Sequence, residues 1–153
     1  MSRAKEVKQR VRTARGRTLS STRWLERQLN DPYVHKAKAE GYRARSAYKL
    51  LEIDAKHHLL RPGRRVVDLG AAPGSWSQVC ARKGLAVVAL DLQPIDPLAG
   101  VTTLEGDFRE TAALERLHAA LQGPVDLVLS DMAAFATGQR LVDRLKAEEL
   151  AEL

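Results

Sequence analysis

The sequence predicts an α/β domain with a parallel sheet, preceded by a shorter and strongly basic helical segment. Two observations lead to this prediction. Beyond the helix-breaking residues 61–63 (Arg-Pro-Gly), short runs of branched apolar residues alternate with stretches of helical periodicity. The first of these runs enters a turn of small residues, within the stretch VVDLGAAPGSWSQ, before the next helix. Strands and helices that alternate through right-handed crossovers build parallel sheets, so both observations favour a doubly wound fold.

Three helices are expected before the first strand. The first starts at Ser21, where apolar residues begin to recur at helical spacing. Asp31-Pro32 is typical of an N-cap followed by proline at the first helical position, and Gly41 is typical of a helix C-terminus. We expect the third helix to start at Ser46. The side chains that it would direct toward the core are Leu50, Leu51 and Ile53.

Four strands and three helices are expected in the remainder of the chain. The branched apolar runs predict strands at 65–69, 86–90, 101–104 and 125–130. Helical periodicity predicts helices at 77–83, 111–121 and from 139 to the end of the sequence. Glycine and proline residues separate these elements, as expected for turns.

The net charge of +6 is concentrated at the N-terminal end of the 153-residue chain. Nine Lys or Arg and two Glu give residues 1–27 a net charge of +7, whereas residues 28–61 carry +3 and residues 62–153 carry −4. The aromatic residues among these cations are Trp24, Tyr33, Tyr42 and Tyr48. Cations neutralise phosphates and aromatic rings stack on bases, so the pattern favours a nucleic-acid partner, RNA in particular, over a tail that only aids solubility.

The domain boundaries are predicted from the same composition. Residues 1–20 have few large apolar side chains and no clear period, so we expect a flexible basic arm there. Residues 21–153 would form one domain, with N-terminal helices in residues 21–60 and the α/β portion in residues 61–153. A chain of 153 residues is long enough to bury one core of this kind.

Cysteine content and hydropathy predict a cytoplasmic protein without a membrane partner. The single cysteine, Cys80, excludes an internal disulfide framework and suits a reducing compartment. No apolar run approaches the length of a membrane span, and the basic N-terminus lacks the hydrophobic region of a secretory leader. His57-His58 has no further ligand at metal-binding spacing, so we expect no metal site. Cys80 itself is expected to be a small core residue.

The small-residue turn predicts a cofactor of the nucleoside type. A strand, such a turn and a helix N-terminus form the nucleotide-binding corner of doubly wound folds. The segment Gly70–Gly74 lacks the middle glycine of the G-x-G-x-x-G fingerprint, which lets the backbone approach a pyrophosphate. A less open turn suits a cofactor without a pyrophosphate, and S-adenosylmethionine meets that description. The same glycine pattern disfavours an NAD-dependent dehydrogenase.

Acidic residues in or just after the predicted strands support this site. Asp91 ends the second strand 21 residues after Gly70, the spacing at which a carboxylate reaches ribose hydroxyls. Asp107 follows the third strand, where a carboxylate can accept an adenine amino hydrogen while the ring of Phe108 packs on the base. Asp68 and Asp131 accompany the first and fourth strands. One such residue is usually a turn former, but four in succession favour a cofactor site.

Several motifs in order resemble those of a known family. The stretch DLGAAPGSWSQ, followed by LDLQPIDPLAGV, GDFRE and SDMA, is similar to the FtsJ-type ribosomal RNA 2′-O-methyltransferases. The upstream stretch DPYVHKAKAEGYRARSAYKLLEID resembles that family too, and the similarity runs from about Ser20 to the C-terminus. The resemblance implies a Rossmann-like, S-adenosylmethionine-dependent enzyme. It would methylate a ribose 2′-hydroxyl of a uridine in large-subunit ribosomal RNA, so the expected partner is ribosomal RNA or the large ribosomal subunit.

The resemblance also implies site residues. The cofactor contacts of the family fall on Gly74, Trp76, Asp91, Asp107 and Asp131. Its catalytic lysine falls on Lys49 and its catalytic aspartate on Asp131. A ribose hydroxyl is a very weak acid, so methyl transfer needs a base such as a lysine to accept or polarise its proton. The aspartate would orient this lysine and stabilise the cationic sulfonium region.

The sequence departs from the family pattern at three places. Ser75 stands where the family usually has glycine, and we expect it to cap the following helix. Ala134 stands where proline is usual. The family uses a further lysine and a glutamate later in the chain, but this sequence ends at Leu153. We therefore expect a sheet that is incomplete on its C-terminal side, with an apolar edge at 125–130 that a partner covers or a longer chain completes.

Two classes of function remain open from the sequence. The first is the ribosomal RNA ribose methyltransferase described above. The second is a catalytically incomplete cofactor- or RNA-binding remnant of such an enzyme.

Overall fold

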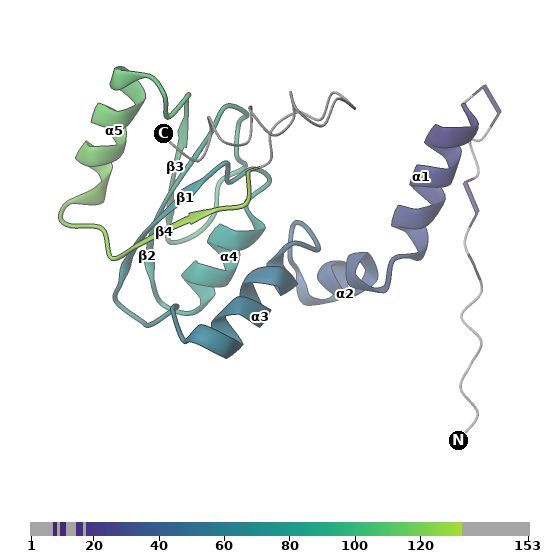
Figure 1. Cartoon of the computed structure of the whole chain (residues 1–153), viewed down its shortest axis with the longest axis horizontal. Helices are drawn as coiled ribbons and strands as arrows, with labels where there is room; N and C mark the ends of the chain where they lie inside the picture. Colours follow the sequence, from purple (N-terminus) through teal and green to yellow (C-terminus); the bar gives the residue numbers. More distant parts are fainter. Residues whose placement is uncertain (1–7, 9, 12–14, 17, 133–153) are drawn as a thin grey trace, which may run out of the picture.

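The computed structural model describes residues 8, 10–11, 15–16 and 18–132. Three helices precede the first strand; after it, α4 connects β1 to β2, a loop connects β2 to β3, and α5 connects β3 to β4 (Figure 1). The helices are α1 (Leu19–Asn30), α2 (Pro32–Glu40), α3 (Ala47–His57), α4 (Ser75–Arg82) and α5 (Thr111–Leu121). The strands are β1 (Arg65–Leu69), β2 (Ala86–Asp91), β3 (Val101–Glu105) and β4 (Leu127–Ser130).

The four strands form one parallel sheet in the order β3-β2-β1-β4. The chain runs outward from β1 to β2 and β3, then crosses back to place β4 on the other side of β1. The reversal occurs beside β1, so the carboxyl ends of β1 and β4 flank the crevice in which doubly wound folds bind ligands. The fold class predicted from the alternation of strands and helices is therefore confirmed, as a Rossmann-like α/β fold.

Helices cover both faces of the sheet. Alternate strand residues point to opposite faces, and here apolar residues on both faces are buried under helices. On one face, Val66 and Val87 belong to a buried cluster that includes Leu50 of α3 and Val79 of α4. On the other face, neighbouring strand residues pack on α5. The members of that second cluster are Val67, Val88, Leu117 and Leu121. Cys80 is fully buried in the first cluster, as predicted.

Local signals place the helix ends close to their predicted positions. Asp31 caps α2 by accepting a hydrogen bond from the backbone N–H of Tyr33 at 2.8 Å. Gly41 ends α2 in the left-handed conformation, at φ +77°. The first helix starts two residues earlier than predicted, because the Thr18 hydroxyl accepts a hydrogen bond from the Ser21 N–H at 3.2 Å.

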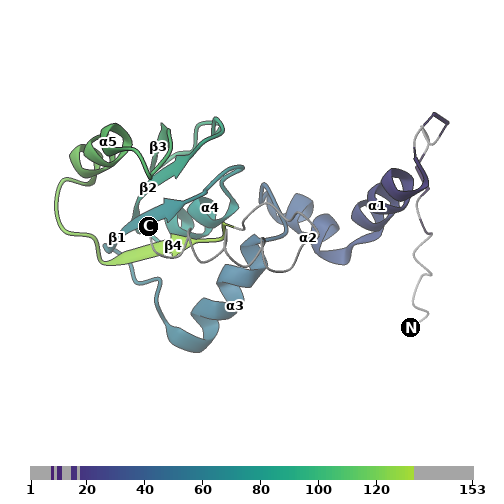
Figure 2. The ribbon, with the colours of Figure 1, turned by 45° about the horizontal axis from the view of Figure 1, so that its top comes forward.

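The first two helices lead away from the sheet. In Figures 1 and 2, α2 continues outward from α3, and α1 lies beyond it at the end farthest from the strands. None of the described side chains of α1 is buried, and Trp24 is 54% exposed. The helices α1 and α2 of the basic segment therefore extend away from the α/β portion.

Several predictions fall partly or wholly outside the described residues. The helix expected from residue 139 lies entirely outside them, as does most of the arm of residues 1–20. Within the described residues, β4 is an edge strand and Val128 is 60% exposed, while Leu129 is buried. In the same part of the chain, no helix is long and apolar enough to cross a membrane. No metal-binding cluster of His, Cys, Asp or Glu occurs among the residues that the structure describes.

Candidate functional site

The turn between β1 and α4 is shaped by two glycines in left-handed conformations. Gly70 has φ +67° and Gly74 has φ +112°, values that strain any residue with a side chain. A Cβ at Gly70 would collide with the side chain of Met132, and a Cβ at Gly74 would lie 3.0 Å from Leu98 Cδ1. These positions admit only glycine, because the backbone lies close to the segments that follow β2 and β4. The turn is thus built of small residues, as the sequence predicted, and packs closely against both of these segments.

Asp91 links the end of β2 to this turn. Its Oδ2 accepts a hydrogen bond from the Ala72 N–H at 2.9 Å, and its Oδ1 accepts one from the Gln93 N–H at 2.8 Å. Each carboxylate oxygen has a second lone-pair direction, so the side chain is held in place and can still accept from a ligand. The predicted ribose-binding carboxylate therefore lies beside the glycine turn, on the neighbouring strand.

Asp107 lies after β3 and is paired within its own loop. Arg109 donates to both carboxylate oxygens, with Nε at 2.9 and 3.0 Å and one terminal nitrogen at 2.6 Å. These side-chain hydrogen bonds, followed by one from the Arg109 backbone, hold the pKa of Asp107 below its usual value. Asp107 is therefore a fixed, ionised acceptor at neutral pH.

Lys49 and Asp131 come together although 82 positions separate them in the sequence. Lys49 Nζ on α3 lies 2.8 Å from Asp131 Oδ1, just beyond β4. The two side chains remain 62% and 34% exposed, so a substrate can reach the pair. A direct contact between the two residues that the family resemblance singled out is the central geometric feature of this site.

The indole of Trp76 lies close to Lys49 of this pair. Its ring is buried on α4, and its Nε1 donates to the carbonyl oxygen of Ser46 at 2.9 Å. Lys49 Nζ lies 5.9 Å from the ring centroid, within the range of a cation–π interaction. The indole of α4 therefore lies close to both the start of α3 and the Lys49 ammonium.

Asp68 differs from the other strand-associated carboxylates because it points into the core. It is 1% exposed and accepts a hydrogen bond from the Ser77 hydroxyl at 2.8 Å. Burial raises its pKa to about 6, and the charges of Asp131 and Asp91 add to this effect against the opposing Ser77 hydrogen bond. Asp68 therefore binds α4 through Ser77 inside the core, and its carboxylate is not exposed to a ligand.

The prediction that Ser75 caps α4 is wrong. Gly74 occupies the N-cap position of α4, and no side chain of the described residues caps the helix there. Ser75 is buried and its hydroxyl instead lies 2.7 Å from the Ser46 hydroxyl. The reason is the close contact between α3 and α4, which turns the Ser75 hydroxyl sideways toward the neighbouring helix. The two serines join the α3 start to the cofactor turn, a link that sequence spacing did not indicate.

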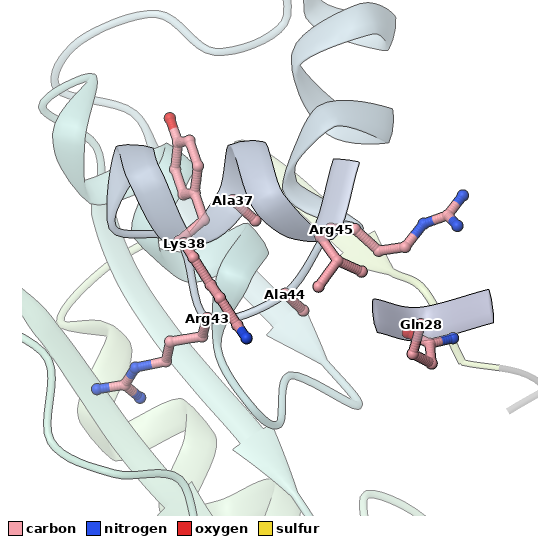
Figure 3. A pocket seen from close by; sticks show the side chains of 8 residues that line it. Gln28, Ala37, Lys38, Arg43, Ala44 and Arg45 are labelled. Atoms are coloured by element: carbon pink, nitrogen blue, oxygen red, sulfur yellow. The ribbon is translucent and has the colours of Figure 1, made fainter. Parts of the chain in front are cut away.

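A basic cavity of about 230 Å³ lies between the end of α1, the helix α2 and the segment 42–45 (Figure 3). Its lining residues are Gln28, Val34, Ala37, Lys38, Tyr42, Arg43, Ala44 and Arg45. Next to it, the rings of Tyr33 and Tyr42 each lie within 6 Å of the Tyr48 ring, at centroid distances of 5.6 and 5.7 Å. The aromatic residues predicted to lie among the cations therefore form one cluster in three dimensions, with Trp24 separate on α1.

Cations surround this aromatic cluster. Lys36 Nζ lies 4.7 Å from the Tyr48 ring centroid, and the Arg82 guanidinium lies 4.2 Å from that of Tyr42. Tyr33 is half-exposed, whereas Tyr48 donates its hydroxyl hydrogen to Glu40 at 2.9 Å. Aromatic rings stack on bases and cations neutralise phosphates, so this surface has the chemistry to hold a single-stranded nucleic acid.

The fold and this site together define a class of protein. A Rossmann-like sheet with a glycine turn and carboxylates after successive strands fits a nucleoside-type cofactor, and the donor set contains no pyrophosphate-binding glycine. An exposed Lys–Asp ion pair lies just beyond β4. This combination is typical of nucleoside-cofactor-dependent group-transfer enzymes.

The comparisons with known proteins agree with that class and narrow it. A profile of the FtsJ-like methyltransferases matches residues 42–153, so the chain belongs to the FtsJ-like methyltransferase family. A protein of Maricaulis maris named ribosomal RNA large subunit methyltransferase E is 53% identical over 151 residues, which cover 98% of this chain and 54% of that protein. Its namesake in Novosphingobium aromaticivorans is 55% identical over 155 residues, covering 99% and 70%. The chain thus spans between about half and 70% of the length of these relatives.

A solved structure supports the same fold. A Plasmodium falciparum protein described as a ribosomal RNA methyltransferase superposes with a TM-score of 0.67 and 30% sequence identity. The superposition covers 72% of this chain and 66% of that one. The Rossmann-like methyltransferase fold is therefore shown independently of the motifs.

Proposed function

We propose that this chain carries the methyl-donor site and the Lys49–Asp131 pair of an S-adenosylmethionine-dependent enzyme that methylates a ribose 2′-hydroxyl in large-subunit ribosomal RNA. The observation that supports it best is the 2.8 Å contact between Lys49 and Asp131, beside a turn that only glycine can build. Relatives of the same family bear a matching name, although this chain spans only part of their length. By the family resemblance, the target nucleoside is a uridine.

Five residues would hold S-adenosylmethionine. They are Gly74, Trp76, Asp91, Asp107 and Asp131. Asp91 offers its free lone pairs to ribose hydroxyls, and Asp107 accepts from an amino group of the base. The cofactor supplies an electrophilic methyl group on a positively charged sulfur, and Asp131 provides a negative charge near that position. The glycine turn lets the segments that follow β2 and β4 pack against the backbone at the edge where the cofactor would bind.

Lys49 and Asp131 would act as one unit in the reaction. In its neutral form, with one N–H still donated to Asp131, Lys49 would accept the proton of the 2′-hydroxyl as that oxygen bonds to the methyl carbon and the carbon–sulfur bond breaks. The products would be the 2′-O-methylated ribose, S-adenosylhomocysteine and a Lys49 ammonium held by Asp131. Trp76 limits the positions that Lys49 can occupy. Most of the rate enhancement would then come from holding the oxygen, the methyl group and the base in line.

The basic helical segment would bind the RNA. Tyr33, Lys38 and Arg45, at and around the cavity (Figure 3), would supply stacking and phosphate contacts. The arm of residues 1–20 would add sequence-independent phosphate contacts. We place the enzyme in the cytoplasm because ribosomal RNA is its substrate, and we expect β4, an edge strand in the described part of the chain, to be covered by a further strand or a partner.

Transfer of a labelled methyl group to ribosomal RNA tests this proposal. The substrates are large ribosomal subunits and free RNA isolated from cells that lack the modification, and the product is a 2′-O-methylated nucleotide. Label in a ribose of either substrate supports the proposal. Cofactor binding without transfer to either substrate would favour the second candidate, a binding remnant, for which the part-length match to the relatives is the supporting observation.

A further inference from the structure

Arg43 attaches the segment between α2 and α3 to the two loops that line the cofactor site. One terminal nitrogen donates to the carbonyl oxygens of Pro73 at 2.9 Å and Asp96 at 2.6 Å. The other donates to the carbonyl oxygen of Pro97 at 2.9 Å. Its backbone N–H also donates to Gln78 Oε1 on α4 at 2.7 Å. One residue therefore joins the glycine turn, the loop after β2 and the helix after the turn.

The geometry of these contacts requires arginine. A guanidinium presents several N–H groups in one plane at fixed angles, whereas a lysine ammonium is a single point on a flexible stem. Carbonyl oxygens from two loops, at Pro73 and at residues 96–97, converge on that plane. A Cβ at Gly74 would lie 3.2 Å from Arg43 Nη1, so the turn and the guanidinium are in close contact. Replacement by lysine would keep the charge and release most of the carbonyls.

Arg43 stands between the basic cavity and the cofactor loops. Figure 3 shows its guanidinium directed away from the side chains of Ala44 and Arg45, which line the same cavity. Its polar contacts within the described residues lie on the cofactor side: the turn, the loop after β2 and α4. The charge of Arg43 is thus used within the protein, unlike that of a residue available to phosphates.

We propose that Arg43 is a positioning residue of the methyl-donor site. It holds the turn at Gly70–Gly74 and the loop at 92–98 at the separation that admits the cofactor, and it does so without touching the cofactor. This inference rests on the proposed function, because the donor site is assigned there. Neither composition nor spacing distinguishes Arg43 from the other arginines of the basic segment.

Arg43→Lys tests the proposal, and Arg82→Lys is the matched control. Arg82 also donates to two carbonyl oxygens, those of Glu40 at 3.0 Å and Gly41 at 3.2 Å, but neither belongs to a cofactor loop. Calorimetry with S-adenosylmethionine should show a Kd about tenfold or more weaker in R43K, as expected for the loss of a charged hydrogen-bond set. R82K should bind within about twofold of the unsubstituted protein.

A second readout needs no cofactor. Amide hydrogen exchange in the ligand-free protein should speed up at residues 70–74 and 92–98 in R43K and stay unchanged there in R82K, while the amides of β1 keep their protection in both. Unchanged exchange in R43K, or equal loss of cofactor affinity in both variants, would overturn the role of Arg43. An unsubstituted protein that binds no S-adenosylmethionine would instead overturn the proposed function, so the two failures are distinguishable.

Discussion

The α/β portion and the basic helical segment are built on opposite principles. In the α/β portion, strand residues are buried on both faces of the sheet and the site carboxylates are fixed by hydrogen bonds before any ligand binds. Among the described side chains of α1 and α2, only that of Ala37 is buried, and rings and cations face outward. The core therefore preorganises the donor site, whereas the basic helical segment would bind a polyanion through its exposed charges and rings.

The largest change in activity is expected at Lys49, which belongs to the helical segment and contacts Asp131 of the α/β portion. Replacing Lys49 by Ala should reduce the rate of methyl transfer by about 10²- to 10⁴-fold, the usual contribution of a positioned general base. Cofactor affinity should change much less than the rate, because Lys49 is not one of the five residues proposed to hold the cofactor, although it contacts two of them, Asp131 and Trp76. Single-turnover kinetics with labelled S-adenosylmethionine measure the rate, and calorimetry measures the affinity. A transfer rate in Lys49→Ala within threefold of the unsubstituted rate would show that another group removes the proton.

Unfolding experiments should separate the two regions by their burial. Leu50→Ala removes a fully buried side chain between α3 and the sheet and should lower the free energy of unfolding by about 2–5 kcal/mol. Trp24→Ala, on the exposed surface of α1, should change it by no more than about 0.5 kcal/mol. Urea denaturation followed by circular dichroism gives both values. Similar losses in the two variants would mean that α1 packs against more of the protein than its exposure indicates.

The sequence predicted the α/β portion more fully than the contacts between its parts. Strand and helix positions followed from periodicity, and the turn after the first strand followed from its run of small residues. The fourth strand starts at Leu127 and not at residue 125: at Asp126 the backbone N–H donates to the Arg65 carbonyl oxygen at 2.9 Å, but the Arg65 N–H is bound by the Asp126 side chain at 2.8 Å. Side-chain competition of this kind leaves no periodic signal.

Contacts between distant residues were the least predictable. Lys49 was singled out only by family resemblance, since an exposed helical lysine has no distinctive neighbours in the sequence. Arg43 was not singled out, because its partners are backbone carbonyls, which every residue possesses. The link between Ser46 and Ser75 was missed for a related reason: the spacing of Ser75 equally suits a helix cap, and only the packing of α3 on α4 decides between them.

Asp68 in the α/β portion should make the free energy of unfolding depend on pH. The pKa of Asp68 is raised to about 6 in the folded protein, above its ordinary value of 3.8. Between these two values the folded state binds more protons than the unfolded state, so this group's contribution to the free energy of unfolding is greatest below about pH 4 and falls as pH rises to about 6. The loss should be about 1–3 kcal/mol. Asp68→Asn should remove it.

The measurement for this prediction is the difference between the two stability curves. Urea denaturation of the unsubstituted protein and of Asp68→Asn from pH 4 to pH 7 isolates Asp68, because carboxylates such as Asp107 are common to both proteins. Parallel curves across this range would show that Asp68 ionises normally in the folded protein.

The last prediction concerns RNA binding by the basic helical segment. It tests whether charge alone determines the affinity for RNA. RNA affinity should fall steeply with salt, and removing one phosphate-neutralising cation should reduce the slope of log K against log salt by about 0.7 for single-stranded RNA. Deleting residues 1–20, which contain seven Lys or Arg, should therefore flatten the slope by several times the effect of Lys38→Ala at the cavity. Fluorescence anisotropy between about 50 and 200 mM salt measures both slopes. If the deletion leaves the slope unchanged while Tyr33→Ala weakens binding at every salt concentration, stacking on the exposed ring, and not the charge of the arm, would be what holds the RNA.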